Sequence, residues 1–329
     1  MCYHRGVSAF SEVSILVVSW NQGELLGRCL EAVGAFLPGA EVRVLDNGSA
    51  PALVPVAGVH WERSEENVGF AAGNNRLLAG VTRPYVLLLN NDVLLSSGEP
   101  VRALLAFLRA RPEVGAAQGT LRLPDGTSDA CGERLTRLGV LSHRGYRQAP
   151  GEVAARAATV LAGKGALLLV RREAIAAAGG LFRPEFFCYY EDVDFCHRLW
   201  LAGYEVWYVP TEPALHAEGS SARALPQRQL WRGYLSNMLA SAGALWGWRL
   251  WLGRGGFFLA AVVGACILKG VLPVWRGRGP RFVRKRREGD FLARVTERTP
   301  PGYYRGLARK LAVGSGYAII QAIAERNKR

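Results

Sequence analysis

The chain has 329 residues, half of them hydrophobic, so it can bury a substantial core, which excludes a disordered protein. Its formal net charge of +14 predicts an anionic partner, such as a phosphorylated substrate, a phospholipid surface or a nucleic acid. The six cysteines show no CxxC pairing, which favours free thiols in a reducing compartment over a secreted disulfide scaffold. Residues 1–12 form a leader without an apolar core, which predicts no signal peptide and a cytoplasmic protein.

Apolar runs alternate with amphipathic segments over roughly the first 120 residues, which predicts a doubly wound α/β domain with a mainly parallel sheet. Short turn sequences separate these runs, as expected for connections between strands and helices. The expected strands are 13–20, 41–45, 59–62, 86–89 and 114–118, and the expected helices lie around 25–33, after 69, and over 99–109.

The apolar run from Val86 to Leu89 lacks the alternation of a half-solvated strand, so it predicts a strand covered on both faces. The run ends in Asn90, Asn91 and Asp92, at the carboxyl end of the strand, where open α/β sheets bind ligands. A carboxylate at this place suits a divalent cation that neutralises a diphosphate. The alternative is a polar turn that merely ends the strand.

Two further turn sequences follow expected strands. Asp46 opens the turn 46–49 and is placed to accept a hydrogen bond from a ribose hydroxyl or a base N–H, although an ordinary turn aspartate is the alternative. The segment 66–75 is rich in Gly and Asn where a helix should begin. Small residues there let backbone N–H groups approach a phosphate, and a tightly packed helix start is the alternative.

The segment after residue 120 changes character. A Pro-Asp-Gly sequence within 121–127 predicts a hairpin. The segment 131–156 has little periodicity and predicts a long functional loop of the kind that often contacts an acceptor. Regular structure is expected again in a strand at 167–170 and a short helix at 171–178.

Three carboxylates then fall within four residues, at Glu191, Asp192 and Asp194, behind an aromatic segment and at the start of an expected helix. The helix dipole favours acids at this position, so they could be structural. Adjacent acids beside an aromatic wall also suit a general base, and the sequence leaves both readings open. His216 follows a strand at 206–209 and could complete a metal site with Asp92, although a lone His is usually structural or exposed.

The polar motifs occur in one order over nearly two-thirds of the chain. They are Ser19-Trp20-Asn21, Asp46-Asn47-Gly48-Ser49, Asn67-Val68-Gly69-Phe70-Ala71, Asn74, Leu89-Asn90-Asn91-Asp92-Val93, Gly165-Ala166, Gly179-Gly180-Leu181-Phe182, Phe186-Phe187, Glu191-Asp192-Val193-Asp194-Phe195-Cys196, Gly203-Tyr204 and His216. In this order they resemble the GT-A glycosyltransferases of family 2, particularly the rhamnosyltransferase-like branch. The resemblance implies a GT-A catalytic domain over 13–222, with a mixed, mainly parallel sheet flanked by helices.

The resemblance also implies roles for single residues. Asp46 is similar to the acid that contacts the base or ribose of a nucleotide-sugar donor. Asp192 is similar to the general base of an inverting transfer, and Glu191 would tune it or hold the acceptor. Asp92 resembles the last acid of a DxD-type motif that binds the donor diphosphate through Mn²⁺ or Mg²⁺, with Asn90 at the first position of the motif and His216 added to the metal site. The other expected donor-binding residues are Ser19, Trp20, Asn21, Asn47, Asn67, Gly69, Asn74 and Asn91.

The sequence departs from the family pattern at three places. Asn90 is neutral, so metal dependence is less secure than nucleotide binding. The segment 180–185 replaces the usual Gly-Phe-Asp-Glu and lacks its Asp. No Gln-x-x-Arg-Trp of processive synthases lies near Arg198, which favours the transfer of single sugars. The subfamily implies rhamnose from dTDP-rhamnose as the first candidate donor.

The last third of the chain, 223–329, combines Trp-rich sequence at 230–251, an apolar stretch at 256–275 and a cluster of Arg and Lys at 276–287. This composition predicts a helical region that lies in the plane of an anionic membrane, with a full span or a buried helical subdomain as alternatives. The expected enzyme is therefore peripheral on the inner face of the cell membrane and acts on a lipid-linked or cell-surface glycan precursor.

Two other classes of protein fit part of the sequence. A nucleic-acid-binding protein fits the net charge, but no helix-turn-helix, zinc-finger or RRM pattern is present, so no nucleic-acid partner is expected. A non-catalytic membrane-bound homologue acting as a scaffold remains the alternative, and the retained Asp46, Asp92 and Asp192 favour catalysis over it.

Overall fold

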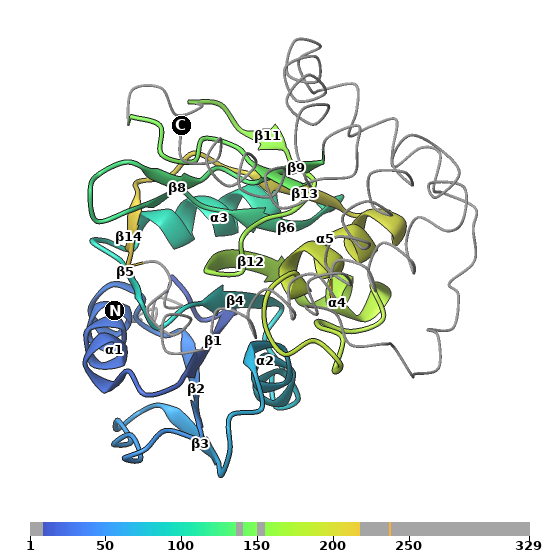
Figure 1. Cartoon of the computed structure of the whole chain (residues 1–329). Coiled ribbons are helices and arrows are strands. Elements are labelled where there is room, and N and C mark those ends of the chain that lie inside the picture. Colours follow the sequence, from blue (N-terminus) through green and yellow to red (C-terminus); the bar gives the residue numbers. More distant parts are fainter. Residues whose placement is uncertain (1–8, 136–140, 150–154, 218–236, 238–329) are drawn as a thin grey trace, which may run out of the picture.

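The computed structural model describes residues 9–135, 141–149, 155–217 and 237 (Figure 1). The membrane-associating region expected at 223–329 therefore lies outside the described residues, except for Asn237. In the described part of the chain, no helix is both long enough and apolar enough to cross a membrane. The four cysteines that fall in it are free, as expected: Cys29, Cys131, Cys188 and Cys196.

The centre of the fold is an eight-stranded sheet. Its strands are β1 (Val13–Ser19), β2 (Glu41–Asn47), β3 (His60–Ser64), β4 (Tyr85–Leu89), β6 (Val114–Gln118), β11 (Ala158–Thr159), β12 (Leu167–Arg171) and β13 (Glu205–Tyr208). They lie in the order β11-β13-β6-β12-β4-β1-β2-β3. The strands expected from the apolar runs are thus present, and the expected mixed α/β class is confirmed.

Strand direction differs across the sheet. The pairs β1–β2, β1–β4, β2–β3 and β6–β13 are parallel, whereas β12 runs antiparallel to both of its neighbours, β4 and β6. The strand itself is predicted by the apolar run at 167–170, but its direction is not. Because β12 is reversed, its first residues lie at the edge where the parallel strands end. Leu167 pairs with Leu89, and the N–H of Asn90 donates to the carbonyl of Ala166 over 3.0 Å.

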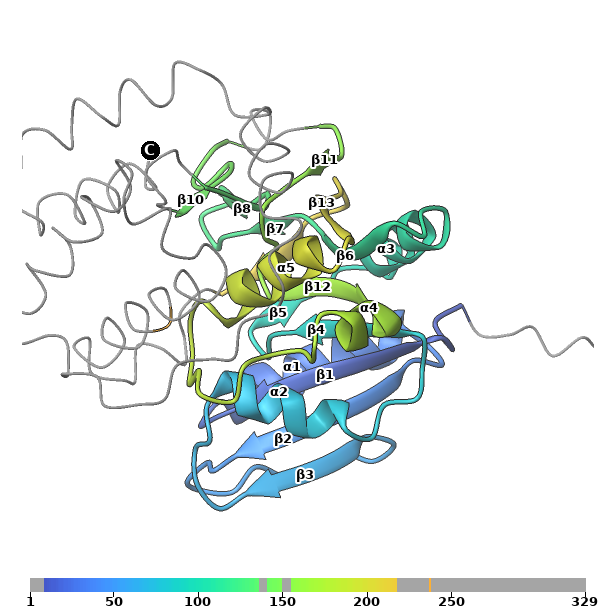
Figure 2. The same ribbon diagram turned by 90° about the vertical axis from the view of Figure 1, so that its right-hand side faces the viewer.

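Helices cover both faces of the sheet. The first face carries α1 (Gly23–Phe36) and α3 (Glu99–Arg109), and the second carries α2 (Phe70–Leu78), α4 (Arg172–Ala177) and α5 (Glu191–Leu201). Figure 2 shows the second set in front of the sheet. This arrangement explains why the central strands are apolar along their whole length, since both faces of each strand are buried.

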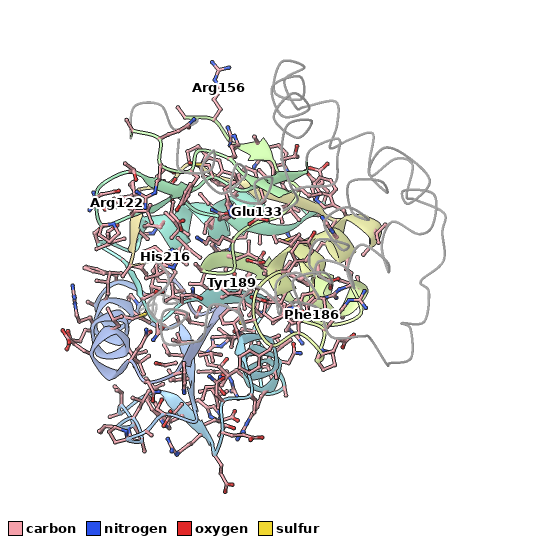
Figure 3. The ribbon with its side chains drawn as sticks, viewed as in Figure 1. Arg122, Glu133, Arg156, Phe186, Tyr189 and His216 are labelled. Carbon is pink, nitrogen blue, oxygen red and sulfur yellow. The ribbon has the colours of Figure 1, made fainter. Side chains whose placement is uncertain are left out.

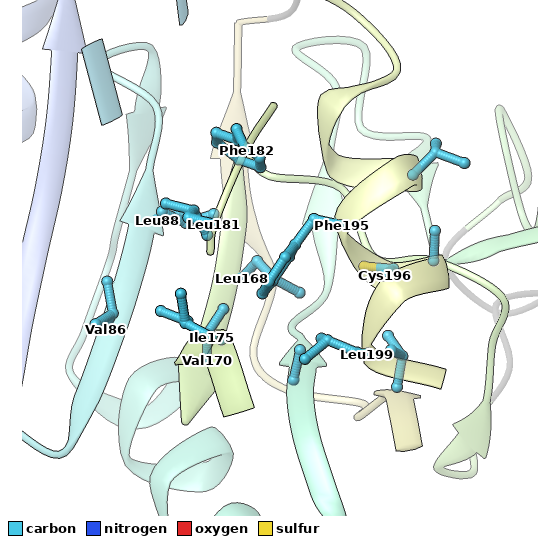
Figure 4. Close-up of a cluster of buried hydrophobic side chains, with 14 of the residues drawn as sticks. Val86, Leu88, Leu168, Val170, Ile175, Leu181, Phe182, Phe195, Cys196 and Leu199 are labelled. Atoms are coloured by element: carbon cyan, nitrogen blue, oxygen red, sulfur yellow. The ribbon is translucent and has the colours of Figure 1, made fainter. Parts of the chain in front are cut away.

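Successive residues of β4 belong to opposite cores. Leu87 and Leu89 pack with α1 and α3, whereas Val86 and Leu88 pack with α2, α4 and α5. Figure 4 shows the second cluster, in which side chains of β4 and β12 meet those of α4 and α5. This burial fixes the place where the following turn, 90–92, begins.

Two small sheets adjoin the main one. The first contains β5 (Val93–Leu94), β7 (Leu121–Arg122), β8 (Ser128–Ala130) and β14 (Ala214–His216), and its β7–β8 pair forms the expected hairpin. The second contains β9 (Glu133–Leu135) and β10 (Leu141–His143). The prediction of a loop over 131–156 was therefore wrong for β9 and β10. Strands of three residues are too short to give a recognisable periodicity.

The three acids at the start of α5 separate into two groups. The carboxylate of Asp194 is fully buried and accepts hydrogen bonds from Nε of Arg183 at 3.0 Å and Nε of Arg198 at 2.8 Å. Arg198 also donates to the carbonyls of Ala178 and Gly180, at 2.9 and 2.6 Å. Asp194 therefore has a structural role, as one of the two interpretations of the acid cluster predicted. Through the two arginines it links α5 to the segment after α4.

Substitution Asp194→Asn is expected to lower the free energy of unfolding by about 3 kcal/mol, because it leaves two arginines without their buried counter-charge. Urea unfolding would measure the loss, and Glu99→Gln is the control. Glu99 pairs with Arg102 on the surface, with 59% of its side chain exposed, so its replacement should change little. Equal losses in the two variants would contradict this assignment.

Candidate active site

The polar turns predicted from the sequence meet at one edge of the main sheet. The strand order reverses between β1 and β4, and open α/β sheets bind ligands beyond such a point. At this point Nδ2 of Asn91 donates to Oγ of Ser19 over 3.0 Å and to Oε1 of Gln22 over 2.8 Å. Trp20, partly exposed, follows Ser19 at the end of β1. The structure thus brings together Ser19 and Asn91, two of the expected donor-binding residues.

Asp46 shapes the turn beside β2. Its carboxylate is fully buried and accepts hydrogen bonds from the backbone N–H groups of Ser49 and Leu53, each over 3.0 Å, and from Arg63. Burial raises the pKa of Asp46, but these hydrogen bonds outweigh it and hold the pKa below its ordinary value. Asn21 is joined to the same turn, since its N–H donates to Oγ of Ser49 over 2.9 Å. Asp46 and Asn21 therefore order one loop.

The glycine-rich helix start is held by amide side chains. Asn47 donates to Oδ1 of Asn67 over 2.9 Å, and that oxygen also accepts from the N–H of Gly69. Gly69 has φ of 88°, and a Cβ there would lie 2.4 Å from the carbonyl oxygen of Phe187, so only glycine fits. Asn74 is buried in α2 and donates to the carbonyl of Phe70 over 2.9 Å. These contacts order the helix start, and donor binding by these residues stays a prediction.

Asp92 and His216 lie together as expected, and the structure adds two residues that the sequence did not reveal. Nε2 of His216 is 3.3 Å from Oδ1 of Asp92, and Nδ1 of His216 is 2.7 Å from Oδ2 of Asp129. Nζ of Lys164 in turn donates to both oxygens of Asp129, over 2.7 and 2.8 Å. Strands β5, β8 and β14 position this chain of charges, since β14 pairs directly with β5 and Asp129 lies in β8.

The opposite charges of these residues shift their pKa values and stabilise the buried network. Burial lowers the pKa of His216, but hydrogen bonds with Asp129 and Asp92 raise it to about 9. Burial raises the pKa of Asp129, whereas the charge of Lys164 and the hydrogen bond with His216 lower it far below its ordinary value. A lone carboxylate that is fully buried would be costly, and its two cationic partners offset that cost.

The residues at this place fit a divalent cation in donor chemistry. A metal-binding imidazole commonly donates its other N–H to a carboxylate, which is how Asp129 holds His216. The buried Oδ1 of Asn90 accepts no hydrogen bond from any described residue. The described part of the chain has no group of three or more His, Cys, Asp or Glu side chains that could hold a metal ion. A cation held by Asp92 and His216 would therefore need further oxygens, from a diphosphate or from water, to complete its coordination.

Asp192 lies at the start of α5, beside the beginning of β12. The N–H of Gly165 donates to its Oδ2 over 3.0 Å, and the N–H of Val193 donates to its Oδ1 over 2.8 Å. Burial and the charge of Glu133 raise the pKa of Asp192 to about 6, against the lowering effect of these two hydrogen bonds and of Lys164. A half-buried carboxylate with this pKa can accept a proton near neutral pH.

Glu191 precedes Asp192 in α5 but differs from it in burial and in pKa. Only 7% of its surface is exposed, and its Oε2 has no hydrogen-bond partner among the described residues. Burial and the charge of Asp192 raise its pKa well above the ordinary value. Glu191 is therefore the acid that more readily keeps its proton.

The turn before α5 holds the two acids in place. Tyr189 and Tyr190 have φ of 67° and 72°, a conformation that aromatic residues rarely adopt. The side chain of Asn237 donates to the carbonyls of Cys188 and Tyr189, over 3.2 and 2.9 Å. The resulting turn leads into α5, whose start lies next to β12 through the hydrogen bond between Gly165 and Asp192; Figure 3 labels Tyr189 together with Glu133, Phe186 and His216.

Comparison with protein families identifies the family of the chain. The family model "Glycosyltransferase like family 2" matches residues 11–236, more than half of the chain. The chain belongs to this family. It is a glycosyltransferase, and the GT-A resemblance read from its motifs is confirmed.

Two curated relatives show different extents of similarity. An uncharacterized protein of Sinorhizobium fredii, y4gI, is 29% identical over 64% of this chain, which corresponds to only 25% of that protein. An N-acetylglucosaminyl-diphospho-decaprenol L-rhamnosyltransferase of Mycobacterium tuberculosis is 28% identical over 71% of this chain and 85% of its own length.

A solved structure supports the fold. The crystal structure of GalNAc-T7 with UDP, GalNAc and Mn²⁺ superposes with a TM-score of 0.55 at 15% identity, over 77% of this chain and 50% of the other. At this identity the likeness concerns the fold alone.

Proposed function

We propose that the chain is an inverting glycosyltransferase that moves one sugar from a nucleotide-sugar to a hydroxyl of a lipid-linked or cell-surface glycan precursor. The observation that carries this proposal is that two distinct charged groups lie at one edge of the sheet. The Asp92–His216 pair lies beyond β4, and Asp192 lies beyond the start of β12. A donor diphosphate and an acceptor hydroxyl need such separate partners.

The proposed reaction uses Asp192 as the general base. Its carboxylate takes the proton of the acceptor hydroxyl while the acceptor oxygen forms a bond to the anomeric carbon of the donor sugar. The bond between that carbon and the diphosphate oxygen breaks, and the nucleoside diphosphate leaves from the opposite face, so the configuration inverts. The N–H groups of Gly165 and Val193 hold the carboxylate in the orientation for this step.

Donor binding is assigned to the turns that follow β1, β2 and β4 and to His216. We assign the turns that carry Asp46, Asn21 and Asn91 to the nucleoside, and Asp92, His216 and the amide oxygen of Asn90 to a divalent cation, Mn²⁺ or Mg²⁺. The cation, when bound, offsets the negative charge that develops on the leaving diphosphate. Asp129 and Lys164 are positioning residues, since they act through His216.

The M. tuberculosis relative suggests the finer identity of the substrates. Its name states an L-rhamnosyl transfer to N-acetylglucosaminyl-diphospho-decaprenol. We therefore propose dTDP-rhamnose as the donor and a diphosphate-linked lipid sugar as the acceptor. An enzyme that acts on such a lipid would work peripherally at the inner face of the cell membrane, which agrees with the basic composition of 276–287.

A thermal-shift panel tests the donor half of this proposal. Full-length protein is heated with dTDP, UDP or GDP, each with Mn²⁺, with Mg²⁺ or without metal. A ligand at about a hundredfold over its Kd should stabilise the protein by about 2.7 kcal/mol, which corresponds to a shift of several degrees. We expect dTDP with metal to give the largest shift. A panel without any shift would contradict nucleotide-sugar binding and favour the scaffold alternative.

Replacement of Asp129 should weaken the cation site without touching it directly. Asp129→Asn removes the charge that orients His216, so the affinity for Mn²⁺ in the presence of the nucleotide is expected to fall about 10- to 100-fold. Titration of free Mn²⁺ by electron paramagnetic resonance measures the change. Asp125→Asn, in the turn of the same hairpin, is the control. Unchanged Mn²⁺ affinity in Asp129→Asn would contradict the positioning role.

A further inference from the structure

Glu133 is a buried acid that the reaction described above does not use. It lies in β9, and only 4% of its surface is exposed. Its Oε1 is 3.1 Å from Nδ1 of His143, whereas its Oε2 has no hydrogen-bond partner among the described residues. A buried carboxylate oxygen without a donor costs free energy, so Oε2 can gain stability from a donor that the described residues do not supply.

The backbone places Glu133 next to the general base. Its N–H donates to the carbonyl of Ala162 over 2.8 Å, and the N–H of Leu161 donates back to its own carbonyl over 2.8 Å. Three residues after Ala162, Gly165 donates to the carboxylate of Asp192. Strand β9 and the base are thus attached to the same short segment, 161–165. The charge of Glu133 also contributes to the raised pKa values of Asp192 and Glu191, as expected for neighbouring acids.

Two carboxyl oxygens without a hydrogen-bond partner among the described residues belong to acids that neighbour Asp192. Oε2 of Glu191 lacks a partner next to Asp192 on α5, and Oε2 of Glu133 lacks one on β9. Each is more than nine-tenths buried. Two unpartnered carboxyl oxygens near Asp192 match a ligand that carries several hydroxyl groups, since a hydroxyl can both donate and accept a hydrogen bond. A sugar has this chemistry.

We propose that Glu133 binds the acceptor: its Oε2 accepts a hydrogen bond from a sugar hydroxyl that neighbours the hydroxyl attacked by Asp192. The proposal deepens the function given above and rests on it. His143, with 36% of its side chain exposed, lies beside the other oxygen of Glu133, with its Nδ1 3.1 Å from Oε1. Glu133 would thereby help to select which acceptor hydroxyl reaches the base.

The test separates acceptor binding from donor binding. Wild type, Glu133→Ala and Glu133→Gln are assayed with dTDP-rhamnose and a short-chain lipid diphosphate of N-acetylglucosamine as the acceptor probe. Donor hydrolysis by water is measured in parallel, together with dTDP affinity. We expect the KM for the acceptor probe to rise at least tenfold in Glu133→Ala and less in Glu133→Gln, which retains an acceptor oxygen. Hydrolysis and dTDP affinity should stay within about twofold of the wild type. These magnitudes correspond to the loss of one hydrogen bond to a charged group.

Glu113→Ala is the matched control, because Glu113 is an exposed acid just before β6. If Glu133→Ala leaves the acceptor KM unchanged while the wild type transfers, the inference alone is wrong. A parallel loss of dTDP affinity and thermal stability would identify Glu133 as a structural residue and also overturn it. If the wild type neither transfers rhamnose to the probe nor hydrolyses the donor, the proposed function fails and the inference fails with it.

Discussion

Asp192→Asn is expected to lower the rate of sugar transfer about a thousandfold, within the range of general-base catalysis. The asparagine side chain can still accept the N–H groups of Gly165 and Val193, but it cannot take a proton from the acceptor. Donor binding should therefore persist, because the donor is assigned to Asn91, Asp92 and the Asp46 turn, which the substitution leaves unchanged. Steady-state transfer and dTDP affinity, measured on the same preparation, distinguish a loss of catalysis from a loss of donor binding.

Glu185→Gln is the control for this variant, since Glu185 is an exposed acid on the segment before α5. It should retain full activity. Transfer by Asp192→Asn within tenfold of the wild type would exclude Asp192 as the base. A simultaneous loss of dTDP binding would mean that the residue supports the fold of the site instead.

The pH profile gives an independent check on the same residue. The pKa of Asp192 is raised to about 6 by burial and by Glu133, and the base works only when deprotonated. The transfer rate should thus rise with pH through about 6 and level off above it, and it should fall as the pH decreases below that value. A rate that stays constant down to pH 4.5 would contradict the role of Asp192.

The second large effect is expected for Asp92→Ala. The variant should lose the metal-dependent part of the stabilisation by dTDP, about 2.7 kcal/mol at a hundredfold over Kd, because it removes the carboxylate nearest Nε2 of His216. Stabilisation by dTDP without metal should remain, since Asn91 and the Asp46 turn are untouched. The thermal-shift panel on the variant measures the stabilisation by dTDP with metal and without it.

Asp92→Asn is the matched variant, since it keeps an oxygen of the same reach but no charge. We expect it to retain a smaller metal-dependent shift than the wild type. A full metal-dependent shift in Asp92→Ala would place the cation elsewhere, and the roles of His216 and Asn90 would then be wrong as well.

The sequence predicted the parts of the fold that have a regular pattern. The unbroken apolar run of β4 requires two covered faces, and the structure places α1 and α3 on one face and α4 and α5 on the other. The sequence placed polar residues after β1, β2 and β4, at strand ends where ligands bind, and the hydrogen bond between Ser19 and Asn91 joins the end of β1 to the turn after β4. The direction of β12 was not predictable, since an apolar strand reads the same in both directions.

Two residues of the candidate site, Asp129 and Glu133, could not be predicted from the sequence for a different reason. Asp129 lies in a strand of three residues, and its partners His216 and Lys164 are 87 and 35 positions away in the chain. Glu133 lies in an equally short strand inside a segment expected to be a loop. Such strands carry no periodicity, and a buried acid can be recognised only when its partners are known. The nearby hairpin signal could have suggested that β8 folds back toward the site.

Asp194 shows why an acid cluster is ambiguous in sequence alone. Its spacing of two residues from Asp192 looks like part of one catalytic group, yet the helical rotation turns it toward Arg183 and Arg198. Arg183 occupies the segment that lacks the usual family Asp. In this chain an arginine there supports α5 through Asp194.

The anomeric configuration of the product tests the central claim most directly. Wild-type enzyme is incubated with dTDP-rhamnose and the lipid diphosphate probe, and the one-bond carbon–proton coupling at the anomeric centre of the product is measured by NMR. Direct attack by the acceptor, with Asp192 as base, predicts a configuration opposite to that of the donor. A product with the donor's configuration would contradict the single-displacement mechanism and the role given to Asp192.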